Sequence, residues 1–351
     1  MKRKYVKVLI LLFVLILIPA TLYFMLKQYR KAKQDIYISE TNLIPAIYCI
    51  GDSLTHGTEG DEYSYPYLLW KDLERDGIYI PVHNYGVGGE NVPTICGRVG
   101  SSPYSVNHCT IPSKTEPVEI DFTDESVNPL LQGGEEQINP CIISSIEGEI
   151  TYNDDKYYFT RLKEGKSVEV QTNEIIETYV TGQIKNDKGA IYVIFMGENG
   201  GYNDIDELID YQKSIVDMCN DNNQKYIIVG LTSGSAADRA ALESRMNEEY
   251  GDKYLNLREY LITEGIDSLV KENKITLTDT DKDQISRGIV PDSLRTDSVH
   301  FTKEGYELVE KAVYSKLYEL NYFSDIQDQV KDFNSKWWFA IKLEQLRQKI
   351  N

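Results

Sequence analysis

Short apolar runs alternate with helical patterns at both ends of the chain. Runs typical of buried strands lie at 45–50, 78–82, 190–196, 225–231 and 254–257. Apolar residues recur at helical spacing in 65–74, 204–220, 236–250 and 303–320. This alternation predicts an α/β fold, a parallel sheet covered by helices on both faces in three layers (α/β/α). In such sheets the active site forms outside the carboxyl ends of the strands.

The segment 98–188 breaks this rhythm. Short β-like pieces separated by Gly, Asn, Asp and Pro turns lie at 118–122, 149–152, 157–162, 167–171 and 175–179, and no helical pattern is convincing. We expect a β-rich subdomain inserted into a catalytic domain made of 35–97 and 189–322. Elaboration of a loop is one interpretation of this insertion, but its position on the ligand-binding side of the sheet favours a role in substrate access.

The N-terminal segment 1–34 predicts a membrane anchor. Its run 8–26 holds 19 residues without a charge, just enough for a helix to cross the hydrocarbon core of a bilayer. A cleaved signal peptide is the alternative, disfavoured because the small-residue site at 18–20 is poor and the apolar run continues past it. Basic residues flank the run on both sides and give no orientation. We expect a single-pass protein of a bacterial cell membrane with an extracellular catalytic domain, because one N-terminal anchor usually serves export.

The C-terminal segment 323–351 predicts an amphipathic tail. It mixes acidic and basic residues with Trp337, Trp338 and Phe339. Aromatic residues beside lysines suit a membrane interface, and packing on the body is an equally open alternative.

The charge of the chain excludes one class of partner. The formal net charge is -18, and residues 1–34 hold eight basic and no acidic residues, so 29 basic and 55 acidic residues remain for the body. Such a body repels polyanions, so we expect no nucleic acid partner.

Metal sites and a disulfide framework are not indicated. The five cysteines are few and scattered, and only Cys96 and Cys109 are close enough in sequence for a bridge, which the sequence leaves open. The stretch 279–283 opens like a calcium loop, but Gln284 stands where glycine is required and Val290 where glutamate is required. We therefore expect no metal ion.

Two motifs carry candidate chemistry. Gly-Asp-Ser-Leu at 51–54 follows the first predicted strand and delivers Ser53 to the carboxyl edge of the sheet. Asp297 and His300, three residues apart, precede the last predicted helix. The carboxylate can hold one nitrogen of the imidazole while the other faces the serine, whose hydroxyl is a weak nucleophile until a base takes its proton.

Together with two glycine-containing stretches, these motifs resemble the SGNH, or GDSL, hydrolase superfamily of serine esterases and lipases. The stretches are Asn-Tyr-Gly-Val-Gly-Gly at 84–89 and Gly-Glu-Asn at 197–199. The resemblance implies a flavodoxin-like fold, Ser53 as nucleophile, His300 as base and Asp297 as its partner. It also implies an oxyanion hole formed by the N–H groups of Ser53 and Gly89 and the side chain of Asn199.

The third stretch departs from the family pattern. Gly200 replaces the usual aspartate after Asn199, and a literal Gly-Tyr-Asn-Asp lies at 201–204. We favour Asn199 because it directly follows the strand, whereas Asn203 and Asp204 are typical of a helix N-cap.

These observations predict a serine esterase that hydrolyses O-acyl, in particular O-acetyl, esters on cell-surface or extracellular carbohydrate through an acyl-enzyme, without a cofactor. An acidic body with 26 tyrosines suits neutral polysaccharide, because aromatic faces stack on sugar rings. The alternatives are a lipase or lysophospholipase, an acyltransferase with the same triad, and a non-catalytic glycan-binding surface protein. The last is disfavoured because every catalytic position is filled.

Overall fold

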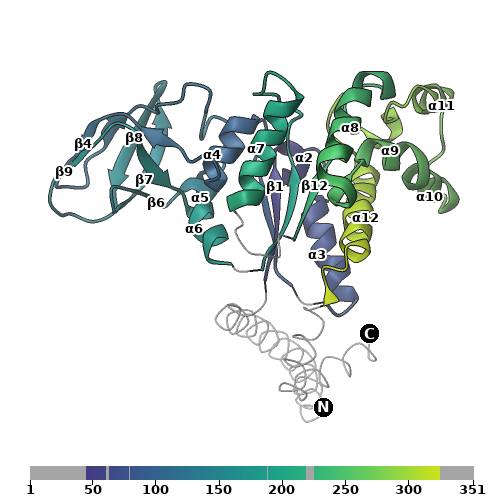
Figure 1. Cartoon of the computed structure of the whole chain (residues 1–351), viewed down its shortest axis with the longest axis horizontal. Helices are drawn as coiled ribbons and strands as arrows, with labels where there is room; N and C mark the ends of the chain where they lie inside the picture. The colour runs from purple at the N-terminus through teal and green to yellow at the C-terminus, as the bar shows by residue number, and fades with distance from the viewer. Residues whose placement is uncertain (1–44, 61–62, 79, 188, 219–224, 325–351) are drawn as a thin grey trace, which may run out of the picture. The chain divides into compact units, whose positions relative to one another are not determined.

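The computed structural model describes residues 45–60, 63–78, 80–187, 189–218 and 225–324 (Figure 1). These residues belong to the second of two compact units, Pro45–Asn351. The predicted anchor at 8–26, Cys219 and the tail beyond 324 lie outside the described residues. Within the described ranges, no helix is both long enough and apolar enough to cross a bilayer.

A five-stranded parallel sheet forms the centre of this unit. Its strands are β1 (Ile47–Gly51), β2 (Val82–Gly86), β11 (Ile191–Phe195), β12 (Lys225–Val229) and β13 (Tyr254–Leu255). They lie in the order β13-β12-β11-β1-β2. Counted along the chain within this sheet, that order is 2-1-3-4-5, which is a doubly wound arrangement. The predicted α/β class with a parallel sheet is therefore confirmed.

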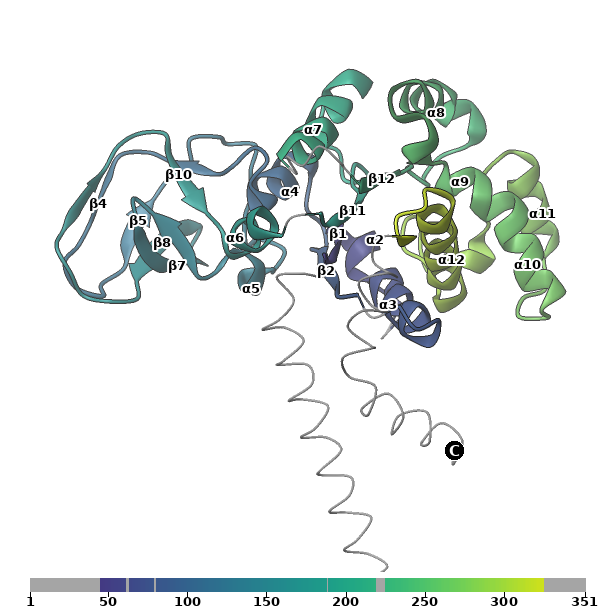
Figure 2. The ribbon, with the colours of Figure 1, turned by 60° about the horizontal axis from the view of Figure 1, so that its bottom comes forward.

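Helices cover both faces of this sheet (Figure 2). Tyr48 and Ile50 on β1 share a buried cluster with one group of helices. That group is α4 (Val92–Val99), α6 (Tyr179–Asn186), α7 (Ile205–Met218) and α8 (Ala236–Tyr250). Helices α3 (Tyr65–Arg75) and α12 (Lys303–Glu319) pack against each other on the opposite face. The turn after β1 forms the short helix α2 (Ser53–His56).

The second strand of the sheet begins later than predicted. The apolar pattern at 78–82 is wrong as a strand, because β2 runs from Val82 to Gly86 and pairs with β1 over that whole length. Strand β2 lies at the edge of the sheet, so it has no need of a continuous apolar run. Ile78 and Ile80 are buried, but they precede the strand.

The inserted segment forms its own antiparallel sheets, which confirms its β-rich character. A six-stranded sheet has the order β3-β10-β6-β7-β8-β5, and β4 pairs with β9. The strands are β3 (Ser105–Val106), β4 (Cys109–Ile111), β5 (Val118–Ile120), β6 (Cys141–Ile143), β7 (Ile146–Asn153), β8 (Lys156–Arg161), β9 (Val168–Val170) and β10 (Glu174–Glu177). Phe159, Ile150 and Ile143 belong to a separate buried core between them.

The expectation of no helix in this segment is wrong. Helix α5 (Glu135–Ile138) and helix α6 lie within it, and both contact each other. Thr178 caps α6 by accepting a hydrogen bond from the N–H of Thr181. A polar helix surface and a length of only four residues left α5 without a readable helical period.

Short helices follow the sheet before α12. They are α9 (Leu257–Tyr260), a π-helical turn at Leu261–Gly265, α10 (Ile266–Lys271) and α11 (Asp279–Ser286). The calcium-like stretch at 279–283 lies in α11. Its Asp281 accepts hydrogen bonds from the N–H and Oγ1 of Thr278, so this carboxylate caps a helix.

Glu310 on α12 is a buried carboxyl group, and its burial predicts how the stability of the protein depends on pH. The side chain is 4% exposed, and its Oε1 atom has no hydrogen-bond partner among the described residues. Burial, with a contribution from Asp72, raises its pKa to about 8, whereas the pKa of glutamate in an unfolded chain is about 4.3. The folded protein therefore holds this proton more tightly, and the free energy of unfolding falls as the pH rises from about 4 to about 8.

Glu310→Gln removes this ionisation while keeping the size of the side chain. We expect the thermal midpoint of the variant to exceed that of the wild type by several degrees at pH 9 and to match it closely at pH 5. Glu319→Gln, at the exposed end of the same helix, is the control and should leave the pH dependence unchanged. Equal pH slopes for Glu310→Gln and the wild type would contradict the prediction.

Candidate active site

Ser53 lies where the central strand β1 turns into a helix. Strand β1 ends at Gly51, and Ser53 is the first residue of α2. The carboxylate of Asp52 fixes this turn, because its Oδ1 accepts a hydrogen bond from the N–H of Leu54 at 3.0 Å. Ser53 is 5% exposed, so little of its surface is accessible to solvent.

The structure brings Asp297, His300 and Ser53 into one hydrogen-bonded chain. The Nε2 atom of His300 lies 2.9 Å from the Oγ atom of Ser53, although 247 positions separate them in sequence. The Nδ1 atom of His300 lies 2.7 Å from Oδ2 of Asp297. These are the contacts that a base and its orienting carboxylate need.

Asp297 is held in its charged form. Its carboxylate accepts hydrogen bonds from the His300 ring and from the N–H groups of His300 and Val299, and these bonds lower its pKa to about 2. A carboxylate that is ionised at neutral pH accepts the Nδ1 proton of His300. The Nε2 atom is then left as the acceptor that faces the Ser53 hydroxyl.

Arg295 anchors the loop that carries Asp297 and His300. Its Nη1 donates to the carbonyl of Ser298 within the loop, and its Nη2 donates to the carbonyl of Thr232, at 2.6 Å, beyond the end of β12. Burial lowers the pKa of Arg295, and nearby carboxylates including Glu198 oppose that effect. The loop is thereby attached to the carboxyl edge of the sheet.

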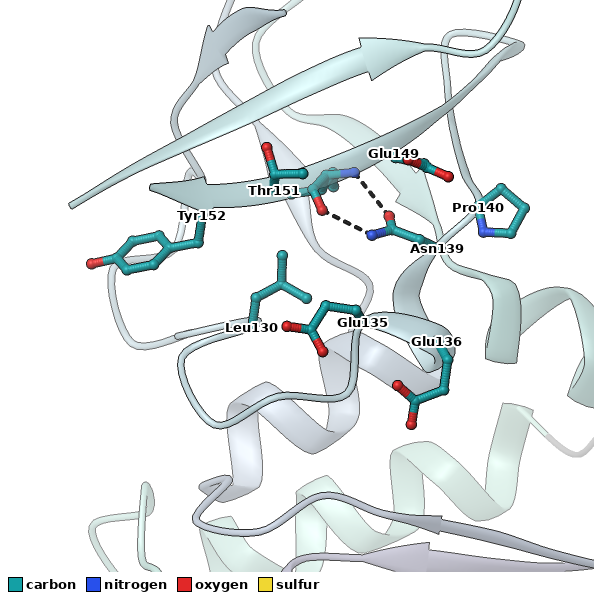
Figure 3. A pocket seen from close by; sticks show the side chains of 9 residues that line it. Leu130, Glu135, Glu136, Asn139, Pro140, Glu149, Thr151 and Tyr152 are labelled. Atoms are coloured by element: carbon teal, nitrogen blue, oxygen red, sulfur yellow. Dashed lines mark hydrogen bonds between the residues drawn. The ribbon is translucent and has the colours of Figure 1, made fainter. Parts of the chain in front are cut away.

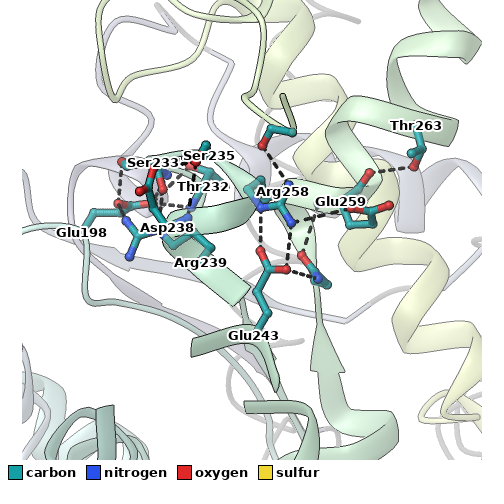
Figure 4. Close-up of polar contacts among 12 residues, drawn as sticks. Glu198, Thr232, Ser233, Ser235, Asp238, Arg239, Glu243, Arg258, Glu259 and Thr263 are labelled. Carbon is teal, nitrogen blue, oxygen red and sulfur yellow. Dashed lines mark hydrogen bonds and ion pairs between the residues drawn. The ribbon is translucent and has the colours of Figure 1, made fainter. Parts of the chain in front are cut away.

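Glu198 joins the loops that follow β11 and β12 (Figure 4). Its carboxylate is 2% exposed, and it accepts hydrogen bonds from the N–H groups of Thr232 and Ser233 and from the Ser233 hydroxyl. Arg239 pairs with it at 3.6 Å. The sequence analysis did not identify these roles of Glu198 and Arg295, because each binds the loop after β12, which is distant in sequence.

The loop after β2, residues 87–90, which we call the glycine loop, places Gly88 beside Ser53. A Cβ atom added to Gly88 would lie 3.9 Å from the Cβ atom of Ser53. Gly89 has a φ of 76°, a conformation that side chains with a Cβ atom rarely adopt. The amide of Asn199 donates to the carbonyl of Glu90 at 3.0 Å, which uses one of its two N–H bonds and places Asn199 against this loop.

Asn203 lies at the beginning of α7. Its N–H and its side-chain amide both donate to the carboxylate of Glu207, and Asp204 accepts from the N–H of Glu207 at 2.9 Å. These are contacts of a helix start, as the sequence pattern predicts for Asn203 and Asp204. The catalytic role assigned to Asn199 stays a prediction.

A turn of the insertion, residues 130–134, lies against the glycine loop. A Cβ atom added to Gly89 would lie 2.8 Å from the Cγ atom of Gln132, and one added to Gly134 would lie 2.9 Å from Val87. The sequence analysis did not identify Gln132, since its approach to Gly89 depends on how the insertion folds back.

The insertion also carries a pocket of about 550 Å³ (Figure 3). It is lined by Leu130, Glu135, Glu136, Asn139, Pro140, Glu149, Ile150, Thr151 and Tyr152. The side chain of Asn139 is already bound to both backbone groups of Ile150, at 2.8 Å each. No residue of the Ser53 site lines this pocket, which is acidic and separate from the proposed chemistry.

The described residues contain neither a candidate metal site nor a disulfide. Among them, no group of three or more His, Cys, Asp and Glu side chains is arranged to hold a metal ion. Cys96 and Cys109, which the sequence left open as a bridge, are free thiols.

Comparison with known proteins adds little to this geometry. No protein-family model and no curated protein matches the chain. Among solved structures, a peptidoglycan O-acetylesterase is similar over 82% of this chain and 95% of its own, with 12% sequence identity and a TM-score of 0.32.

The different contacts of Asn199 and Asn203 predict that one substitution lowers kcat and the other lowers stability. An oxyanion donor acts only as charge develops, so Asn199→Ala should lower kcat by about 10²- to 10³-fold with little change in KM. Asn203→Ala removes an exposed hydrogen bond to Glu207, so it should instead cost about 1 kcal/mol of stability or less and leave kcat within a few-fold. Steady-state kinetics and thermal midpoints of both variants measure the difference. A stable, inactive Asn203→Ala would reverse the assignment.

Proposed function

We propose that this protein is a serine carboxylic ester hydrolase of the SGNH type, which removes O-acetyl groups from carbohydrate at the outer surface of a bacterial cell. The observation that carries the proposal is the chain of contacts from Asp297 through His300 to Ser53, at 2.7 and 2.9 Å. The sheet has a doubly wound strand order, and these hydrogen bonds lie at the carboxyl ends of its strands. Both features support the flavodoxin-like SGNH fold.

The reaction has two halves. Ser53 Oγ attacks the ester carbonyl while its proton passes to Nε2 of His300, and Asp297 stabilises the imidazolium that forms. The oxyanion develops beside the N–H groups of Ser53 and Gly89 and the amide of Asn199. When the intermediate collapses, His300 returns the proton to the leaving alcohol. Water then attacks the acyl-serine by the same route, which releases the carboxylic acid and restores Ser53.

A small acyl group suits the surroundings of the nucleophile. Ser53 is 5% exposed, and the side chain of Gln132 lies against Gly89, whose N–H we assign to the oxyanion. A long acyl chain would have to displace this turn, whereas an acetyl group is no larger than a few heavy atoms. These contacts favour an acetylesterase over a lipase.

The composition of the body and the uncharged run 8–26 support carbohydrate at the cell surface as the substrate. The body is acidic and contains many tyrosines, and Tyr67, Trp70 and Tyr179 expose between 39% and 42% of their surface. Exposed aromatic rings stack on the apolar faces of neutral sugars, while a net negative charge disfavours anionic lipid surfaces. The uncharged run 8–26 supports a single-pass position in the cell membrane with the catalytic domain outside.

The test is a panel of esters with the full-length protein in detergent. We expect kcat/KM for p-nitrophenyl acetate to exceed that for the octanoate at least tenfold, because of the crowding at Gln132. We also expect acetate release from O-acetylated xylan or O-acetylated peptidoglycan, measured as free acetate. Ser53→Ala is the control and should lower kcat by about 10⁶-fold, as for loss of other serine nucleophiles.

Two outcomes would contradict this function. A preference for octanoate would favour a lipase, and transfer of the acetyl group to an added alcohol without release of acetate would favour an acyltransferase. Equal rates of ester hydrolysis for the wild type and Ser53→Ala would show that the protein is not a serine esterase that acts through Ser53.

A further inference from the structure

Arg98, on α4, is buried directly beneath the glycine loop. Its side chain is 0% exposed and its partner Glu90, the residue after Gly89, is 2% exposed. The Nε atom of Arg98 donates to both carboxylate oxygens of Glu90, at 3.1 and 2.9 Å, and Nη2 donates to Oε2 at 2.6 Å. Two nitrogens of the planar guanidinium, Nε and Nη2, therefore bind this carboxylate together, a geometry that a lysine ammonium cannot reproduce.

The same guanidinium reaches the ends of two strands. Its Nη2 donates to the carbonyl of Gly51 at 3.3 Å, two residues before Ser53. Its Nη1 donates to Oε1 of Gln137 at 2.6 Å, and Nε2 of Gln137 donates to the carbonyl of Gly86 at 3.3 Å. Gly86 ends β2, the strand from which the glycine loop departs. Arg98 thus connects the turn that carries the nucleophile with the loop that carries Gly89.

Asn199 belongs to the same network. Its amide donates to the backbone carbonyl of Glu90, the residue whose side chain Arg98 holds. The position of Asn199 therefore depends on the position of Glu90. Arg98 thus binds Gly51, two residues before Ser53, and Glu90, which follows Gly89 and accepts from the amide of Asn199. Ser53, Gly89 and Asn199 carry the groups to which we assign the oxyanion: two backbone N–H groups and the side-chain amide of Asn199.

The insertion supplies part of this support. Gln137 is the third residue of α5, and Thr178, the cap of α6, donates its hydroxyl to the backbone carbonyl of Arg98 at 2.6 Å. Both residues lie in the β-rich segment beyond the end of α4 at Val99, and they reach back to Arg98 on that helix. Gln137 therefore binds the side chain of Arg98, and Thr178 binds the backbone of Arg98.

We propose that Arg98 is a positioning residue that, together with Glu90 and with Gln137 of the insertion, fixes the oxyanion site relative to Ser53. The proposal rests on the proposed function, because an oxyanion forms only if Ser53 attacks a carbonyl. A buried ion pair is a poor source of stability, since the desolvation of both charges offsets their attraction. Its value at this place is the fixed geometry that preorganised donors require.

The test compares Arg98→Lys and Gln137→Met with a matched control, Arg258→Lys, in the full-length protein. Arg258 is also buried and ion-paired, with Glu243, and donates to the carbonyl of Gly288, but it takes no part in the Ser53 site. Arg98→Lys keeps the charge and loses the fork geometry. Gln137→Met keeps the Arg98 and Glu90 pair and removes both amide contacts.

With p-nitrophenyl acetate, we expect Arg98→Lys to lower kcat by about 10²-fold and Gln137→Met by about 3- to 10-fold, each with KM within about threefold of the wild type. The inhibition constant of phenylboronic acid, which forms a tetrahedral adduct with the serine, should rise in proportion to the loss of kcat/KM. Arg258→Lys should lower the thermal midpoint and leave kcat and the inhibition constant within about twofold.

A purely structural role would give another result. If Arg98→Lys and Gln137→Met lower the thermal midpoint but leave kcat and boronate inhibition of the folded protein unchanged, the positioning role is wrong. If Arg98→Lys does not fold, Gln137→Met decides by the same readouts. Failure of the proposed function is recognised separately, in the wild type, by hydrolysis no faster than with Ser53→Ala, and it would overturn the positioning role as well.

Discussion

The site depends on the close approach of two backbones at the carboxyl edge of the sheet. A Cβ atom added to Gly86 would lie 2.1 Å from the backbone nitrogen of His56, so the end of β2 touches the helix that begins at Ser53. Asn84 holds the two together, since its amide donates to the carbonyl of His56 and its Oδ1 accepts from the N–H of Gly86. Only a residue without a side chain permits this contact. The contact brings the glycine loop close to Ser53.

Buried charges surround this contact and fix the remaining loops. Arg98 binds Glu90 below the glycine loop, and Arg295 binds the carbonyl of Thr232. The arrangement has a cost at Asp52, whose burial raises its pKa to about 7 and whose Oδ2 has no hydrogen-bond partner among the described residues. Glu198 and Glu90 contribute to that shift. Because the folded state favours the protonated form of Asp52, this group disfavours folding progressively as the pH rises from about 4 to about 7.

Sequence patterns predicted those parts of the molecule that local chemistry determines. Strands β1 and β11 are buried along their whole length and β12 over its last three residues, and all three are readable as apolar runs. Strand β2 was misplaced because an edge strand needs no such run. Helix α4 was missed although its start is marked by Asn91, whose side chain accepts from the N–H of Thr94, and by a proline in the first turn. The three residues Ser53, Asp297 and His300, chosen from motif and spacing, lie in contact, while their catalytic roles stay predictions.

The contacts of Gln132 and Gln137 could not be predicted, because they arise from the return of the insertion to the sheet edge. Neither residue belongs to a pattern in the sequence, and each is defined only by what it meets in space: Gly89 for Gln132, Arg98 and Gly86 for Gln137. An insertion that only controlled access would contact the catalytic domain at its exposed rim. Gln137 instead binds a side chain with no exposed surface, Arg98 on α4, so removal of residues 100–186 would leave Nη1 of Arg98 without this acceptor. Hydrolysis of small esters should therefore depend on the insertion as much as hydrolysis of polymers does.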